Sequence, residues 1–322
     1  MGKQREGLKT QDGRKMMKKA ILIATAAALI GGFSGNAAAG FLTISNPGNL
    51  ADTRVMSDGT TGYGAVGYTY QIMRYAVTNA QWNDFVQRAG APTGADSGYS
   101  YGSTYTEDAL PVQNVSWYEA AQYCNWLTSG DKYSGAYLFD QDGRFAGIDR
   151  EQAVLDYGKV YALPTEDEWY KAAYYDAQND TYHLYANGSD NPPAAGVDAM
   201  YGQTWPYDGP WNITDGTQEQ NGTYNMMGNV WEWNETAVGS YRVLRGGAFD
   251  TQDDFVLSSA YRHYIAVPHG EFSSAGFRVV VLVPEPTGLA LLLTGGLVVF
   301  RTKAKRHTPV SGSPSPRTPG RV

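Results

Sequence analysis

The sequence contains only three segments with clear helix signals, and long loops separate them. The first, VTNAQWNDFVQRAG, combines a threonine N-cap with apolar residues on one face and a glycine stop. The second and third open with reciprocal capping boxes, Ser116 with Glu119 and Thr165 with Glu168. Because 38 glycines and 24 tyrosines are scattered through the chain, we expect much ordered loop rather than long regular elements.

Three other segments have the character of strands: GYTYQIMRYAVT, YRVLRGGAF and GFRVVVLV. Residues 91–110, 130–160 and 176–222 are rich in Gly, Asp, Asn, Tyr and Pro, and we predict loops there. Loops of this length inside a compact domain are usually functional or held by ions. No repeat or long linker divides residues 40–283, so we expect a single domain over this range.

Residues 1–39 have the organisation of a secretory signal. A basic start precedes an apolar run over residues 20–30, and small residues follow up to Gly40. The run is shorter than the about 20 residues of a membrane-spanning helix. A start at Met16 or Met17 would give a more typical signal, which would make residues 1–15 an upstream extension. Export with cleavage by signal peptidase is therefore expected.

The C-terminal segment carries a different signal. Pro-Glu-Pro stands at residues 284–286, an apolar run reaches Phe300, and a basic cluster ends at Arg306. The run is short for a membrane span, and its basic flank favours the cytoplasmic side. This order of features resembles a PEP-CTERM sorting tail, which implies transient membrane anchoring over residues 284–306 and processing by an exosortase. Residues 307–322 extend beyond the usual end of such tails and are predicted to be a disordered tail.

The body between these segments is strongly acidic. From Gly40 to Val283 there are 12 Lys and Arg against 29 Asp and Glu, a net charge of −17, whereas the whole chain carries −7. Such a body repels nucleic acid and anionic lipid, and it suits cation binding or plain solubility. Because of this charge we exclude nucleic acid as a partner.

Cys124 is the only cysteine, so no intramolecular disulfide can form.

Seven motifs occur in one order along the body: VTNAQWNDF, PVQNVSWYEAAQYCNWL, LPTEDEWYKAA, NMMGNVWEW, LRGGAF, YR and GFRVV. In this order the chain resembles the formylglycine-generating enzyme, or sulfatase-modifying factor, family over roughly residues 65–281. The resemblance implies an α+β fold, a C-type-lectin-like variant with small twisted antiparallel sheets, few helices and extensive loops. Active members of the family are oxygen-dependent oxidoreductases that modify a sulfatase cysteine.

The stretch NMMGNVWEWNE places an acid between two tryptophans, after a Gly-Asn pair. The corresponding motif binds calcium in relatives, which here implies side-chain oxygens from Asn225 and Glu232 and backbone carbonyls from Gly228 and Val230. Calcium prefers about six to eight hard oxygen ligands, and an ion would explain a carboxylate buried among aromatic residues. The alternative is that Glu232 caps backbone amides or pairs with Arg245.

Active relatives hold Cu(I) with two cysteines between RGG and the next arginine, because this soft metal needs thiolate ligands. The corresponding places fall near Thr251 and Ala260, and the whole segment lacks cysteine. Cys124 lies on the predicted buried stripe of the second helix, where a free cysteine is usually a small core residue. Bound copper is therefore not expected.

An iron site of two histidines and a carboxylate is a further hypothesis. His263 and His269 are six residues apart, and Asp250, Asp253 and Asp254 lie upstream. Solvated loop histidines and a solvated or weakly cation-binding acidic loop are the simpler interpretation.

Five residues are candidates for a ligand cleft: Trp231, Arg245, Tyr261, Arg262 and His263. Trp231 matches a position that lines the substrate cleft of the family, and the neighbouring aromatic residues could complete a floor for a peptide or sugar. The two arginines could hold a carboxylate or sulfate. Core packing of the rings and internal ion pairs of these scarce cations are the alternatives.

Together, these features predict an exported, cell-surface or matrix-associated member of the family that lacks copper oxidase activity. We expect a calcium-stabilised module that binds an extracellular polysaccharide or a surface protein. The alternative is an oxidase-type enzyme on the same scaffold, which would generate formylglycine or perform a related metal-dependent oxidation. A purely structural matrix component is the third hypothesis.

Overall fold

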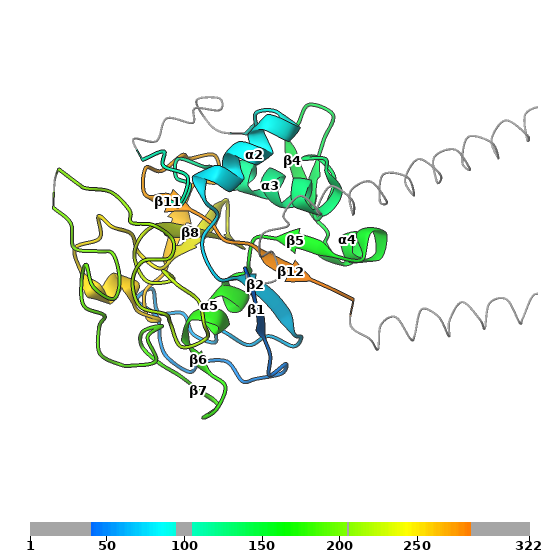
Figure 1. The fold of residues 1–322 in the computed structure, drawn as a ribbon. Coiled ribbons are helices and arrows are strands. Elements are labelled where there is room, and N and C mark those ends of the chain that lie inside the picture. Colours follow the sequence, from blue (N-terminus) through cyan, green and yellow to red (C-terminus); the bar gives the residue numbers. More distant parts are fainter. Residues whose placement is uncertain (1–39, 95–104, 205, 285–322) are drawn as a thin grey trace, which may run out of the picture. The chain divides into compact units, whose positions relative to one another are not determined.

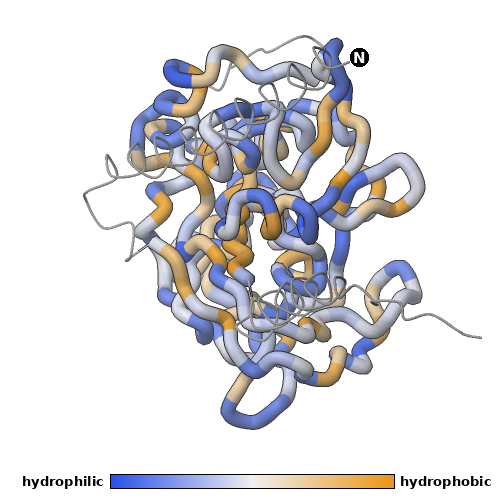
Figure 2. Tube along the Cα trace, turned by 90° about the vertical axis from the view of Figure 1, so that its right-hand side faces the viewer, coloured by the Kyte–Doolittle hydropathy of each residue, from blue (hydrophilic) through white to orange (hydrophobic). Residues whose placement is uncertain are grey.

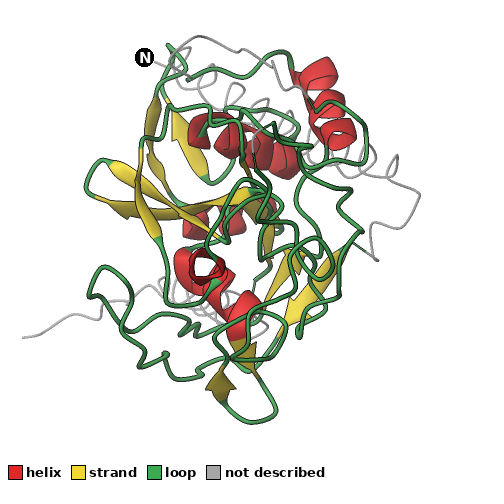
Figure 3. Ribbon diagram, turned by 90° about the vertical axis from the view of Figure 1, so that its left-hand side faces the viewer, coloured by secondary structure: helices red, strands yellow, loops and turns green. Residues whose placement is uncertain are grey.

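The computed structural model describes residues 40–94, 105–204 and 206–284. Within these residues, two four-stranded sheets, two two-stranded sheets and four α-helices are joined by loops that make up most of the chain (Figure 1; Figure 3). This is the α+β architecture expected from the sequence, with small sheets, few helices and extensive loops. The predicted signal segment and most of the predicted sorting tail lie outside the described residues.

The first sheet joins the beginning and the end of the domain. Its strand order is β1 (Phe41–Ile44), β2 (Tyr70–Met73), β12 (Val280–Leu282) and β5 (Val160–Ala162), and all neighbours are antiparallel. The central pairing of β2 with β12 therefore closes the domain across more than 200 residues of sequence.

The second sheet carries the motif with two tryptophans. Its order is β10 (His263–Ala266), β9 (Tyr241–Arg245), β8 (Trp231–Val238) and β11 (Ala275–Gly276). The motif thus runs from a turn directly into the longest strand. The short β11 pairs with β8 in parallel, which departs from the purely antiparallel sheets that were expected.

The three predicted helices are confirmed as α2 (Asn79–Ala89), α3 (Trp117–Ser129) and α5 (Glu166–Tyr174). Each begins with a complete capping box, in which the N-cap side chain and the residue three positions later bond each other's backbone. These signals are local in sequence, which is why they predict the helix starts so well.

The loop predicted over residues 130–160 is wrong in part. It contains a hairpin of β3 (Tyr137–Phe139) and β4 (Phe145–Ile148), followed by α4 (Arg150–Tyr157). The tight Asp- and Gly-rich turn between the strands gave this segment a loop-like composition. A second small ribbon of β6 (Tyr175–Asp176) and β7 (Thr181–Tyr182) follows α5, and a 3₁₀ helix η3 spans Asp254–Leu257.

Aromatic side chains fill much of the core. Trp82 of α2 packs on Phe85, Tyr123 and Phe277, with ring centroids 5.1–6.0 Å apart. Hydrophobic residues occur in short runs along the trace, interrupted by hydrophilic ones (Figure 2). Among the described residues, none of the helices combines the length and apolar character needed to cross a bilayer.

Candidate functional site

A tight turn precedes β8 and is locked between two other loops. Asn225 and Gly228 adopt left-handed backbone conformations, with φ of 58° and 76°. A Cβ on Gly228 would lie 2.3 Å from the Met200 carbonyl oxygen, so only glycine fits there. The Gly228 amide donates to the Gly246 carbonyl (2.8 Å), and the Asn229 amide donates to that of Met200 (2.7 Å). The turn is therefore fixed by long-range backbone contacts.

Glu232 is fully buried and forms a bidentate ion pair with Arg278. Arg278 Nε lies 2.6 Å from Glu232 Oε2, and its Nη2 lies 2.7 Å from Oε1. The indole Nε1 of Trp169 donates a third hydrogen bond to the Glu232 carboxylate, at Oε2 (2.7 Å). Arg245 faces Glu232 across the β8–β9 pairing, but its side chain does not bind this carboxylate. Pairing of Glu232 with Arg245 was therefore the wrong alternative, because Arg278 supplies the charge.

The four expected calcium ligands offer hard oxygens. Asn225 Oδ1 accepts one hydrogen bond, from Trp211 Nε1 (2.7 Å), and Glu232 Oε1 accepts one, from Arg278. Each of these oxygens has capacity for a second partner. The chemistry of the donor set thus fits a hard cation, although Arg278 already balances the charge of Glu232. An ion is not required to explain the burial of this acid.

Sequence patterns gave no signal for a second buried acid beside this turn. Glu219 Oε1 accepts the amides of Met226 (2.8 Å) and Met227 (3.2 Å), and so it orients the residues just before Gly228. Burial raises the pKa of Glu219 to about 7, against the opposing influence of nearby Arg278. Its position in the polar stretch TQEQNGT looked like that of an ordinary solvated glutamate.

Both candidate cleft arginines bind one buried carboxylate, that of Glu166 at the start of α5. Arg245 Nε lies 2.9 Å from Glu166 Oε1, and Arg262 Nη2 lies 2.6 Å from Oε2. Arg262 Nη1 also reaches Asp58 Oδ2 at 2.8 Å. Both guanidinium groups are therefore paired with carboxylates inside the protein, so the structure does not support their predicted role in holding a ligand.

The other three candidate cleft residues lie together and remain partly accessible. Trp231 packs against Tyr261 and His263, with ring centroids 6.1 and 5.7 Å apart. Phe255, which the sequence did not single out, extends the group through Tyr261 (6.1 Å) and is 42% exposed. Burial lowers the pKa of His263, which favours its neutral form. We call these four residues the Trp231 group.

Neither of the places corresponding to the copper ligands carries a metal-binding side chain. Thr251 Oγ1 accepts the amide of Ala248 (2.9 Å), and Ala260 is buried, with its carbonyl accepting the amide of Ser57 (2.8 Å). Cys124 is fully buried on α3, and burial raises the pKa of its thiol. The sulfur is thus a core group, as the helix pattern predicted.

The geometry gives little support to an iron site. His263 packs on Trp231, and Asp253 caps η3 by accepting the amide of Phe255 (3.0 Å). In the part of the chain that the structure describes, no three His, Cys, Asp or Glu side chains gather as metal ligands.

The small sheets, the capped helices and the locked turn before β8 define an α+β domain of the C-type-lectin-like kind. Residues 56–283 match the family model of the sulfatase-modifying factor enzyme 1-like domain. The chain belongs to this family.

Two relatives illustrate its range. The chain is 27% identical over 281 residues to the chaperone protein LppX of Paenibacillus barcinonensis, covering 77% of this chain and 92% of that protein. It is 26% identical over 225 residues to the hercynine oxygenase of Mycobacterium tuberculosis, covering 61% of this chain. The match spans only 48% of the oxygenase, about half of its length.

Solved structures agree with the fold. Treponema denticola variable protein 1 aligns with a TM-score of 0.55 and 21% identity, over 74% of this chain and 94% of that one. PvdO from Pseudomonas aeruginosa aligns with a TM-score of 0.55 and 15% identity, over 76% and 94%. At these identities the likeness establishes the architecture alone.

Proposed function

We propose that this chain is an exported binding domain of its family, displayed at the cell surface or in the matrix, without copper oxidase activity. The observation that carries the proposal is the lack of sulfur at Thr251 and Ala260, together with the burial of Cys124 in α3. A hydroxyl and a methyl group cannot replace two thiolates for Cu(I).

The ligand in this proposal is an extracellular polysaccharide or a surface protein. The partly exposed Trp231 group supports it, since aromatic rings with polar edges suit both ligands. The relative with the most extensive match described above is named a chaperone rather than an enzyme, which agrees with a binding role. Export, cleavage by signal peptidase and processing by an exosortase are part of the proposal and concern segments that lie almost wholly outside the described residues.

We expect no aldehyde when the full-length protein is incubated with a cysteine-containing sulfatase peptide, Cu(I) and oxygen. Mass spectrometry of the peptide is the measurement, with an active formylglycine-generating enzyme as the positive control. Detection of formylglycine would overturn the proposal. Stoichiometric copper or iron in the purified protein, with oxygen consumption, would instead favour the alternative of an oxidase-type enzyme.

Calcium stabilisation is the second part of the proposal and has its own test. At a calcium concentration of about 100 times Kd, binding adds about 2.7 kcal/mol to the free energy of unfolding. We therefore expect chelation to lower the Tm of the wild-type protein by roughly 5–10 °C. Asn225→Gly removes a proposed ligand, tolerates the positive φ and leaves the Glu232–Arg278 pair intact. The Tm of this variant should not respond to chelation, and an unresponsive wild type would refute the calcium site.

A further inference from the structure

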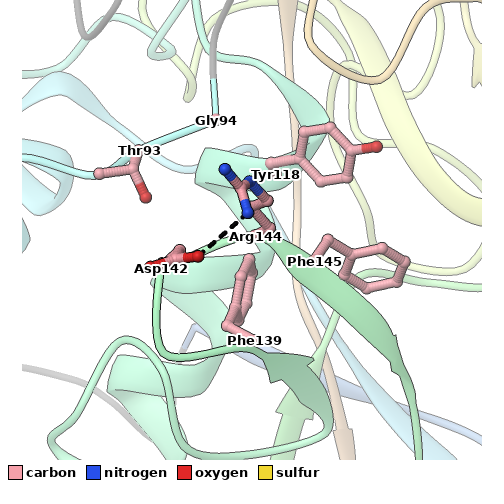
Figure 4. Close-up of a pocket in the computed structure, with 8 residues that line it drawn as sticks. Thr93, Gly94, Tyr118, Phe139, Asp142, Arg144 and Phe145 are labelled. Atoms are coloured by element: carbon pink, nitrogen blue, oxygen red, sulfur yellow. Dashed lines mark hydrogen bonds and ion pairs between the residues drawn. The ribbon is translucent and has the colours of Figure 1, made fainter.

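A concave site that shares no residue with the Trp231 group lies between the β3–β4 hairpin and the start of α3. It has a volume of about 320 Å³, at the small end of the range for ligand pockets. Three aromatic and three polar side chains line it, as Figure 4 shows: Tyr118, Phe139, Phe145, Thr93, Asp142 and Arg144. We call it the hairpin pocket. None of its residues takes part in the sites considered above.

The apolar wall of the hairpin pocket is a set of mutually supported rings. The ring centroid of Phe145 lies 5.6 Å from that of Tyr118 and 6.0 Å from that of Phe139. Behind it, Phe145 contacts the fully buried Trp117 edge-on at 5.2 Å. All three wall residues are only half-buried, so they keep accessible surface toward the pocket.

A rigid turn presents the charged edge of the pocket. Asp140 Oδ1 accepts the amides of Asp142 (2.9 Å) and Arg144 (2.8 Å), and Gly143 between them has a φ of 75°. Arg144 Nη1 and Asp142 Oδ2 lie 3.0 Å apart, but the two side chains are 77% and 71% exposed. The pair therefore leaves further guanidinium N–H groups and a carboxylate oxygen accessible to a ligand.

The third polar group, Thr93, is held in place by a buried side chain. Gln122 of α3 is fully buried, and its Oε1 accepts the Thr93 amide (3.1 Å). Its Nε2 donates to the Thr93 carbonyl (2.6 Å) and to Thr93 Oγ1 (3.3 Å). Because Oγ1 acts as an acceptor inside the protein, its own hydrogen is available to donate outward.

We propose that the hairpin pocket binds a neutral sugar residue of an extracellular polysaccharide. A sugar ring has an apolar C–H face, which fits the aromatic wall, and a rim of hydroxyls that both donate and accept hydrogen bonds. The edge offers both functions side by side, through Asp142 and Arg144. Their charges cancel, and the body carries −17, so an acidic polymer is disfavoured. The inference rests on the proposed binding function and gives it a ligand class and a site.

The test uses the full-length protein and affinity electrophoresis in gels that contain a soluble neutral glucan, mannan or galactan, or acidic polygalacturonate. We expect retardation by at least one neutral polymer. Arg144→Ala should raise its Kd about tenfold, the effect of losing a charge-assisted hydrogen bond. Phe139→Ala should do the same through loss of the apolar wall. Since Arg144 is exposed, its variant should fold normally even if Phe139→Ala does not.

Two matched controls should bind like the wild type. Leu138→Ala changes the neighbouring residue of β3, which is 45% exposed and does not line the pocket. Arg88→Ala breaks another exposed ion pair, with Asp84 on α2. Retardation by no neutral polymer, by the acidic polymer alone, or equally in the pocket variants would overturn the inference. If only Trp231→Ala abolishes binding of the neutral polymer, the hairpin pocket is not the binding site, but the proposed binding function stands. The proposed function itself is refuted by oxidase activity, which is measured separately.

Discussion

Replacement of Glu166 by glutamine is expected to lower the free energy of unfolding by about 3–5 kcal/mol, the cost of breaking a buried ion pair from one side. The variant keeps the shape of the side chain and one acceptor oxygen, so the loss reports the charge. Arg245 is fully buried and would keep only neutral partners, such as the Ser259 carbonyl at 3.0 Å. Arg262 would retain Asp58.

Denaturant unfolding with linear extrapolation measures this loss, and thermal unfolding should show a fall in Tm of roughly 10 °C. Asp84→Asn is the matched control, because it removes an acid from the exposed pair with Arg88. Exposed pairs of this kind contribute about 0.3–0.5 kcal/mol. A Glu166→Gln effect no larger than that of the control would contradict the internal role of this carboxylate.

Arg278→Met should have an effect of similar size, about 3–5 kcal/mol, because it leaves the Glu232 carboxylate buried and uncompensated. Only the indole of Trp169 would still donate to it. The measurement is again the free energy of unfolding, at neutral pH and in the presence of chelator so that no cation replaces the guanidinium.

The double variant Glu232→Gln with Arg278→Met separates charge from packing. It removes both charges while keeping similar volumes, so it should be more stable than Arg278→Met alone. If the double variant loses as much as the sum of the single variants, the two residues are not coupled, and the ion pair is not what holds β8 to the segment before β12.

The helices could be predicted because their start signals are local. A capping box needs only residues three positions apart, as with Ser116 and Glu119, and it forms whatever the rest of the chain does. Strand β8 was harder to predict, because alternation fails there. Glu232, Trp233 and Asn234 are all fully buried, so polar and apolar residues face the interior together. Period-two reasoning cannot detect a strand whose polar side chains are satisfied by distant partners.

The partners of the site residues were the least predictable feature. The acidic first turn of α5 fits the helix dipole, and nothing near Glu166 in sequence indicates that two arginines about 80 and 96 positions later bind it. Sequence reasoning did anticipate that scarce cations in an acidic body would be paired. It proposed Arg245 as the partner of Glu232, and these two residues do face each other across β8 and β9, but Arg245 binds Glu166 and Arg278 binds Glu232.

The shared carboxylate of Glu166 has a consequence for how this domain can change over time. Two separate segments, the end of β9 and the residue before β10, meet at the first turn of α5 through this one acid, and Arg262 links the second of them to the loop at Asp58. Loss of the Glu166 carboxylate leaves Arg245 without an acidic partner, whereas joint replacement of Glu166 and its two arginines by apolar residues of similar volume would be tolerated. Descendants of this sequence should therefore alter these positions together or leave them alone, while the hairpin edge stays free to vary one residue at a time.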